Sequence, residues 1–166
     1  MVFQGLSDSG TNRKILNLLT QYNKKADFFI PGMLAVEDPK FVRGLYNKGH
    51  RIGSNTFMQS NDMHKYSQEE LIDDFVRANI VIKGITNKKP SNLTCNSTKY
   101  TDDLLKAAYS SGNYNVVQPT KFLNYQSFKD YEQVFNYIKN VKKGSIISIK
   151  MDGVLSEGEY DKPTEP

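Results

Sequence analysis

The sequence predicts one α/β domain with a parallel sheet, because strand-like and helix-like segments alternate along the whole chain. Short apolar runs bounded by turn residues are followed by segments whose apolar side chains recur at helical spacing. Such an alternation favours parallel strands joined by right-handed crossovers, but it does not separate a doubly wound sheet from a barrel. The expected strands are residues 1–6, 26–30, 50–53, 90–95, 114–118 and 145–150.

The expected helices are recognised by the residues at their ends. Asp38 followed by Pro39 gives an N-cap and a first-turn proline, and Ser67-Gln-Glu-Glu70 is a capping box. Gly49 is expected to end the second helix in the left-handed conformation that glycine adopts without strain. The five expected helices begin at Thr11, Asp38, Ser67, Thr101 and Ser127.

Length and charge limit the class of protein. A chain of 166 residues is large enough for one domain, 1–166, with a full hydrophobic core. No apolar run approaches the roughly 18 residues that a membrane-spanning helix needs. The net charge of +4 comes mostly from lysines that are scattered through the sequence, without an aromatic-basic motif. We therefore expect a solvated basic surface and no nucleic-acid partner, while attraction to an acidic glycan or a membrane surface stays open.

Two N-glycosylation sequons and one cysteine help to predict whether the protein is secreted. Asn92-Leu-Thr94 and Asn96-Ser-Thr98 predict N-glycosylation at Asn92 and Asn96, which favours a secreted protein. Cys95 has no cysteine partner within the chain and no adjacent His or Lys that would activate its thiol. The N-terminus has no signal-peptide pattern. Met1 leads straight into a strand-like segment and the sequence stops abruptly in Lys-Pro-Thr-Glu-Pro, so we expect a fragment of a longer secreted chain.

The stretch from Lys48 to Gln59 has the pattern of a strand followed by a loop at its carboxyl end. In parallel α/β sheets this end carries ligand-binding and catalytic groups. Asn55 and Gln59 lie four residues apart in that loop. Two imidazoles at these positions would hold a metal, whereas two amides are poor metal ligands.

This stretch resembles the second motif of the polysaccharide deacetylases (carbohydrate esterase family 4), Gly-His-x-Ile-Gly-Asn-His-Thr-x-x-His. The family's two metal-binding histidines are replaced by Asn55 and Gln59. The resemblance extends over nearly the whole chain and implies the family's irregular (β/α) barrel. The chain ends after the sixth expected strand, so the closing helix and strand are missing or lie beyond Pro166. The matching residues are Gly49, His50, Ile52, Gly53 and Thr56.

The other motifs of the family are altered in the same way. In the first motif, Asp8 stands at the general base and Ser9 at the metal-binding aspartate. The third motif falls near Thr94, where the residues that form one wall of the substrate groove are lost. The fourth contains a tryptophan, and this chain has none. Lys150 replaces the family's second catalytic histidine.

The resemblance implies Zn²⁺ or Co²⁺ in the family, but Ser9, Asn55 and Gln59 offer neither a carboxylate nor an imidazole. We therefore expect no metal or other cofactor. Asp8 is expected to cap the first helix or to pair with a lysine, and an ion pair with Lys150 is our specific hypothesis. His50 is expected to be a packed strand histidine.

Our leading hypothesis is a catalytically inactive, chitin deacetylase-like pseudoenzyme, a secreted structural or binding component of a cell surface or wall. A wall polysaccharide such as chitin would be bound weakly or not at all, and the oligomeric state is not predicted. One alternative is an active chitin or peptidoglycan N-deacetylase with Asp8 as base and an unusual metal site that recruits Asp62 or His64. Another is a glycan-binding module, and a basic surface for an acidic polymer is the remotest.

Overall fold

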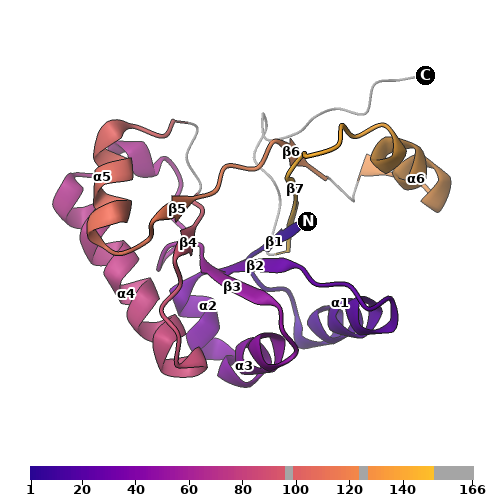
Figure 1. Ribbon diagram of the computed structural model, residues 1–166, viewed down its shortest axis with the longest axis horizontal. Coiled ribbons are helices and arrows are strands. Elements are labelled where there is room, and N and C mark those ends of the chain that lie inside the picture. The colour runs from indigo at the N-terminus through magenta and orange to yellow at the C-terminus, as the bar shows by residue number, and fades with distance from the viewer. Residues whose placement is uncertain (96–98, 124–126, 152–166) are drawn as a thin grey trace.

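The computed structural model describes residues 1–95, 99–123 and 127–151, and it contains a parallel sheet with helices packed along it (Figure 1). The strands are β1 (Val2–Gln4), β2 (Asp27–Ile30), β3 (Arg51–Ser54), β4 (Asn92–Leu93), β5 (Asn115–Val116), β6 (Lys121–Phe122) and β7 (Ile147–Lys150). The helices are α1 (Ser9–Gln21), α2 (Gly32–Glu37), α3 (Pro39–Asn47), α4 (Gln68–Thr86), α5 (Asp102–Ser110) and α6 (Tyr131–Lys139), with a 3-10 turn η1 (Met63–Lys65).

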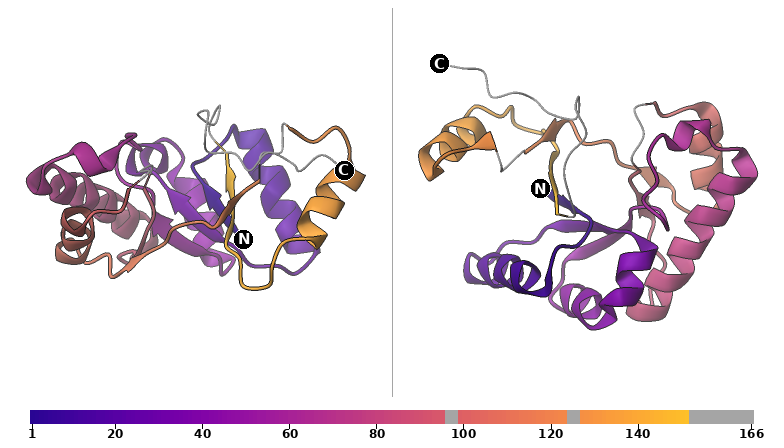
Figure 2. Two further views of the ribbon diagram at one scale, coloured as in Figure 1. Left: turned by 90° about the horizontal axis from the view of Figure 1, so that it is seen from above. Right: turned by 180° about the vertical axis from the view of Figure 1, so that it is seen from behind.

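The strands form one sheet in the order β5-β4-β3-β2-β1-β7-β6. Every pair is parallel, and β1 lies inside the sheet between β2 and the last described strand, β7, with Val2 opposite Ser148 and Gln4 opposite Lys150. The sheet curls, and α1 to α5 lie on its convex side (Figure 2). The predicted α/β fold with parallel strands is therefore confirmed, as an open half-barrel over the described residues.

Apolar side chains on the convex side of the sheet form the core. One cluster of buried residues joins β1 and β2 to α1 and α3 through Phe3, Phe28, Leu16 and Val42. A second cluster joins β4 to α4 and α5 through Leu93, Phe75 and Leu104, among others. The helices are therefore held to the sheet by burial of apolar area, which contributes about 25 cal/mol per Å².

Several helix ends agree with the sequence signals. Asp38 and Thr101 cap α3 and α5, and Ser67 and Glu70 form both hydrogen bonds of the capping box. Gly49 has a φ of +82°, in the left-handed region.

Other boundaries were wrong. The first helix begins at Ser9 with Asp8 as its N-cap, and not at Thr11. The last begins at Tyr131 after Asp130, and not at Ser127, because the Asp130 carboxylate accepts the N–H of Gln133 at 2.9 Å. The short elements α2, η1 and β6 were not predicted, so the last strand is the seventh and not the sixth.

Candidate functional site

The fold brings the candidate residues to one edge of the sheet. Asp8 and Ser9 begin α1 shortly after β1, Asn55 follows β3, Thr94 follows β4, and Lys150 ends β7. These are the carboxyl ends of neighbouring parallel strands, where ligand sites of α/β proteins lie. The edge predicted from the sequence is thus the one that the topology forms.

The Asp8 side chain caps the start of α1. Its Oδ1 accepts the backbone N–H groups of Gly10 at 2.8 Å and Thr11 at 3.0 Å. Hydrogen bonds from the Thr11 hydroxyl and N–H, and then from Gly10, lower the pKa of the Asp8 carboxyl to about 2. The capping role expected for Asp8 is confirmed.

The ion pair that we expected between Asp8 and Lys150 is absent from the ion pairs of the described residues. Asp8 Oδ1 accepts the first N–H groups of α1 instead. That hypothesis was wrong.

Asn55 and Thr94 are the most deeply enclosed of the candidate residues. Asn55 also stands out by its polar atoms. Its side chain is fully buried, and neither its amide nitrogen nor its amide oxygen has a hydrogen-bond partner. Asn55 and Thr94 each follow the register pair Ser54 and Leu93, so their side chains share one face of the sheet. Gln4, which sequence reasoning missed, reaches the same face and donates from Nε2 to the Thr94 hydroxyl at 3.3 Å.

The loop that carries Gln59 is held by a carboxylate from another element. Asp74 of α4 accepts the N–H of Phe57 at 2.7 Å and the N–H of Met58 at 3.3 Å. Burial raises the pKa of Asp74, and the two N–H groups oppose that rise. Thr56 adds an acceptor for the Gln59 N–H at 3.0 Å. No sequence signal distinguishes Asp74 from the neighbouring acidic residues of the helix.

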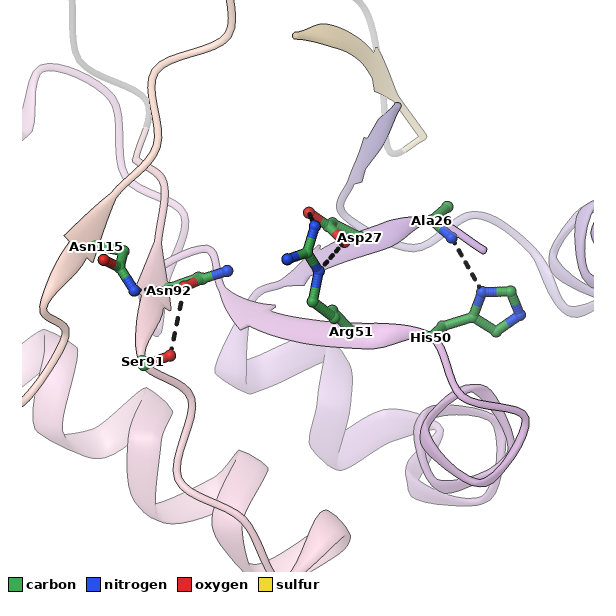
Figure 3. Close-up of polar contacts among 7 residues, drawn as sticks. All are labelled: Ala26, Asp27, His50, Arg51, Ser91, Asn92 and Asn115. Carbon is green, nitrogen blue, oxygen red and sulfur yellow. Dashed lines mark hydrogen bonds and ion pairs between the residues drawn. The ribbon is translucent and has the colours of Figure 1, made fainter. Parts of the chain in front are cut away.

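His50 is packed, as predicted, but it lies just before β3, which runs from Arg51 to Ser54 and not over the expected residues 50–53. Its Nδ1 accepts the N–H of Ala26 at 3.3 Å (Figure 3). Its ring also meets Phe28 edge-on. Burial lowers the pKa of His50, and the charges of Lys25 and Lys48 lower it further. The imidazole therefore acts as a neutral acceptor in the fold.

The donor set at this edge does not fit a Zn²⁺ or Co²⁺ ion. Ser9, Asn55 and Gln59 are neutral, and amides and hydroxyls compete poorly with water for such ions. Within residues 1–95, 99–123 and 127–151 no group of three or more His, Cys, Asp or Glu side chains converges. Asp62, an alternative ligand, pairs with Lys65 at 2.7 Å.

The remaining predicted sites lie near β4. Burial raises the pKa of the Cys95 thiol to about 12, which suits a packed thiol better than a nucleophile. Asn92 lies in β4, where its Oδ1 accepts from Asn115 at 3.0 Å (Figure 3). The second sequon, Asn96 to Thr98, lies outside the described residues, and use of either sequon stays a prediction. No helix of the described residues is long and apolar enough to cross a membrane.

Solved structures with a similar fold include both active and inactive proteins. A family 4 carbohydrate esterase from Streptomyces lividans superposes with a TM-score of 0.79 at 16% identity, over 91% of this chain and 78% of that one. A CE4 family pseudoenzyme from Bacillus anthracis gives 0.77 at 18% identity, over 92% and 55%. A mutant of that pseudoenzyme has restored enzymatic activity. At these identities the likeness shows the fold.

Curated relatives and a family model point to the same class. A peptidoglycan-N-acetylglucosamine deacetylase of Bacillus cereus is 29% identical over 105 residues, which are 63% of this chain and 38% of the relative. A chitooligosaccharide deacetylase of Bradyrhizobium is 24% identical over 99 residues, 59% of this chain and 45% of the relative. The matches thus span less than half the length of these relatives. The model of the polysaccharide deacetylase family matches residues 4–116. The chain therefore belongs to the polysaccharide deacetylase family.

Proposed function

We propose that this protein is a catalytically inactive polysaccharide deacetylase, a structural or binding component of a cell surface or wall. The observation that carries the proposal is the replacement of every metal-binding position by a neutral side chain, at Ser9, Asn55 and Gln59. A catalytic metal lowers the pKa of its bound water from about 15.7 to about 7. Without an anionic or imidazole ligand, this edge of the sheet cannot be expected to hold one.

The state of Asp8 supports the same proposal. A general base works best when its pKa lies near the working pH. Hydrogen bonds at the start of α1 hold the pKa of Asp8 at about 2, so its carboxylate is a weak proton acceptor at neutral pH. The residue that the family uses as a base is therefore suited here to capping a helix.

The partner that we propose is a wall polysaccharide, bound without being deacetylated. The relatives named above are a peptidoglycan-N-acetylglucosamine deacetylase and a chitooligosaccharide deacetylase, so glycans that contain N-acetylglucosamine are the first class to test. Such a partner also agrees with secretion, which we retain as part of the proposal.

The test compares the protein with a variant that regains the ligands, Ser9→Asp/Asn55→His/Gln59→His. We expect the unaltered protein to bind no stoichiometric Zn²⁺ or Co²⁺ in calorimetry and to release no acetate from chitin oligomers or peptidoglycan. The variant should gain affinity for metal. This would show that the edge of the sheet can hold a metal once the ligand side chains are restored. Stoichiometric metal together with acetate release by the unaltered protein would contradict the proposal. Sedimentation with insoluble chitin and peptidoglycan then separates a binding role from a structural one.

A further inference from the structure

Eight cationic side chains, scattered in the sequence, gather at the amino ends of the strands. Seven lie in the segments that lead into four strands of one parallel sheet, Arg51 is the first residue of β3, and all eight are exposed. Because the amino ends of parallel strands meet at one edge, these loops lie on the edge opposite to the candidate site. We call this set the basic edge: Lys24, Lys25, Lys48, Arg51, Lys88, Lys89, Lys142 and Lys143.

Contacts between neighbouring loops hold parts of this edge together. Lys25 Nζ donates to the Lys48 carbonyl at 2.6 Å, which joins the loops before β2 and β3. Lys89 lies over Gly112, so the loop before β4 touches the turn before β5. Arg51 forms two bonds to Asp27, with Nε at 2.6 Å and Nη2 at 2.8 Å (Figure 3).

The charge on this edge is much larger than the charge of the whole protein. The stretches 22–27, 47–51, 87–91 and 140–146 hold eight of the chain's 22 Lys and Arg residues but only one of its 18 carboxylates, Asp27. They carry a formal charge of +7, and the other residues, with 14 cations against 17 carboxylates, carry −3. The net charge of +4 therefore conceals a strong separation of positive from negative charge between these stretches and the rest of the chain.

The helix dipole does not account for this separation. Cations are favoured in the last turn of a helix, and the effect falls off beyond it. Helices α1, α3 and α5 have no basic residue in the last turn. Lys24 and Lys25 follow the end of α1 at Gln21, and Lys88 and Lys89 follow the end of α4 at Thr86.

We propose that the basic edge is a docking surface for a polyanion, a flexible polymer that carries carboxylate or phosphate groups. Neighbouring strands lie about 4.8 Å apart, so the loops form a row of closely spaced cations that an extended chain of anions can follow. The row follows the curl of the sheet, whereas a lipid bilayer is flat (Figure 2). Within stretches 22–27, 47–51, 87–91 and 140–146, Tyr22 is the single exposed large hydrophobic residue, whereas interfacial membrane binding uses a whole apolar face. A polymer is therefore the better fit, and docking would leave the candidate edge facing away.

Binding to poly-L-glutamate and to inorganic polyphosphate tests this proposal. The measurement is fluorescence anisotropy of labelled polymer at 20 to 300 mM salt, roughly the range over which screening grows strong. The test variant is Lys24→Glu/Lys88→Glu. The control, Lys14→Glu/Lys40→Glu, changes the net charge equally at two exposed lysines in the first halves of α1 and α3. Thermal unfolding first establishes that both variants fold.

We expect the unaltered protein to bind both polymers, with affinity that falls steeply as salt rises. The test variant should bind about tenfold more weakly or worse, and the control should lose less than about threefold. Equal losses in the two variants would mean that net charge alone drives binding, and would overturn the proposal. So would the absence of binding at 20 mM salt, or binding to vesicles of one-third anionic lipid but to neither polymer. None of these outcomes depends on whether the protein deacetylates glycans.

Discussion

At the scale of single residues, His50 couples the stability of this fold to pH. The pKa of His50 is lowered in the folded protein by burial, so the unfolded chain takes up a proton near its ordinary value of 6.5 before the folded one does. The contribution of neutral His50 to the free energy of unfolding is therefore complete above about pH 6.5. It is lost as the pH falls toward the lowered pKa that His50 has in the folded protein.

Urea unfolding between pH 8 and pH 5 measures this effect. The midpoint should fall below about pH 6.5 in the unaltered protein, and a His50→Gln variant should lose most of that slope. His64→Gln, which removes the other of the two histidines, is measured for comparison. Identical profiles for the two variants would show that His50 is not the group responsible.

Asn55 gives a second prediction at this scale. Two buried polar atoms without a partner cost stability, typically about 1–3 kcal/mol for such groups. We expect Asn55→Leu, which has the same branched arrangement of heavy atoms, to raise the thermal midpoint by a few degrees, as about 1 kcal/mol does in a chain of this size. Asn113 is the matched control, because its amide donates to Asn79 and Pro90, both at 3.0 Å. Asn113→Leu should lower the midpoint, and an equal change in both variants would contradict the argument.

At the scale of elements, a carboxylate of α4 holds the loop that follows β3. Asp74→Ala leaves the N–H groups of Phe57 and Met58 without their acceptor, at a cost of about 1–3 kcal/mol. Hydrogen exchange measured by NMR should speed up at those two amides more than elsewhere. The control is Asp73→Ala, which removes only an exposed pair with Arg77, worth about 0–1 kcal/mol. If hydrogen exchange sped up equally at all amides of the Asp74 variant, the substitution would have destabilised the whole fold and not this loop alone.

A buried pair of amides joins α4 to the turn after α5. Asn79 Nδ2 donates to Asn113 Oδ1 at 2.8 Å, and Asn113 Nδ2 donates back to Asn79 Oδ1 at 3.0 Å. Changing either residue to alanine should cost about 1–3 kcal/mol, because the other amide loses a partner. The double variant should cost clearly less than the sum of the two single variants, with a coupling of about 0.5–3 kcal/mol in chemical-denaturation data. Strict additivity would mean that the two amides act independently.

The elements that were predicted correctly are those marked by residues close together in the sequence. The capping box at Ser67 and the N-caps at Asp38 and Thr101 depend on residues three apart, and they were located correctly. The two-residue strand β6 was missed, whereas the equally short β4 and β5 lie within the expected strands 90–95 and 114–118. At the candidate site the sequence predicted which residues share an edge. It could not predict Gln4 or Asp74, because their contacts to Thr94 and Phe57 cross between elements far apart in the chain.

At the scale of the whole molecule, the described sheet depends on its last strand. β7 pairs with β1 and also with the edge strand β6. We expect a chain ended at residue 144 to aggregate or to lose cooperative unfolding, because β1, which lies inside the sheet, would then have an open edge. A chain ended at Met151 keeps β7 and should unfold cooperatively. Size-exclusion chromatography and thermal unfolding compare the two, and a monomeric, cooperative shorter chain would contradict this prediction.

The position of β1 between β2 and β7 also sets the order of folding events. Val2 pairs with Ser148, almost the full length of the described chain away, so the β7 side of β1 stays unpaired until residues 147–150 have been made. Contacts so distant in sequence form late and slow folding, and unpaired edges invite association in the meantime. The described sheet is therefore completed only when β7 joins it, and β1 is among the last of its strands to gain both neighbours.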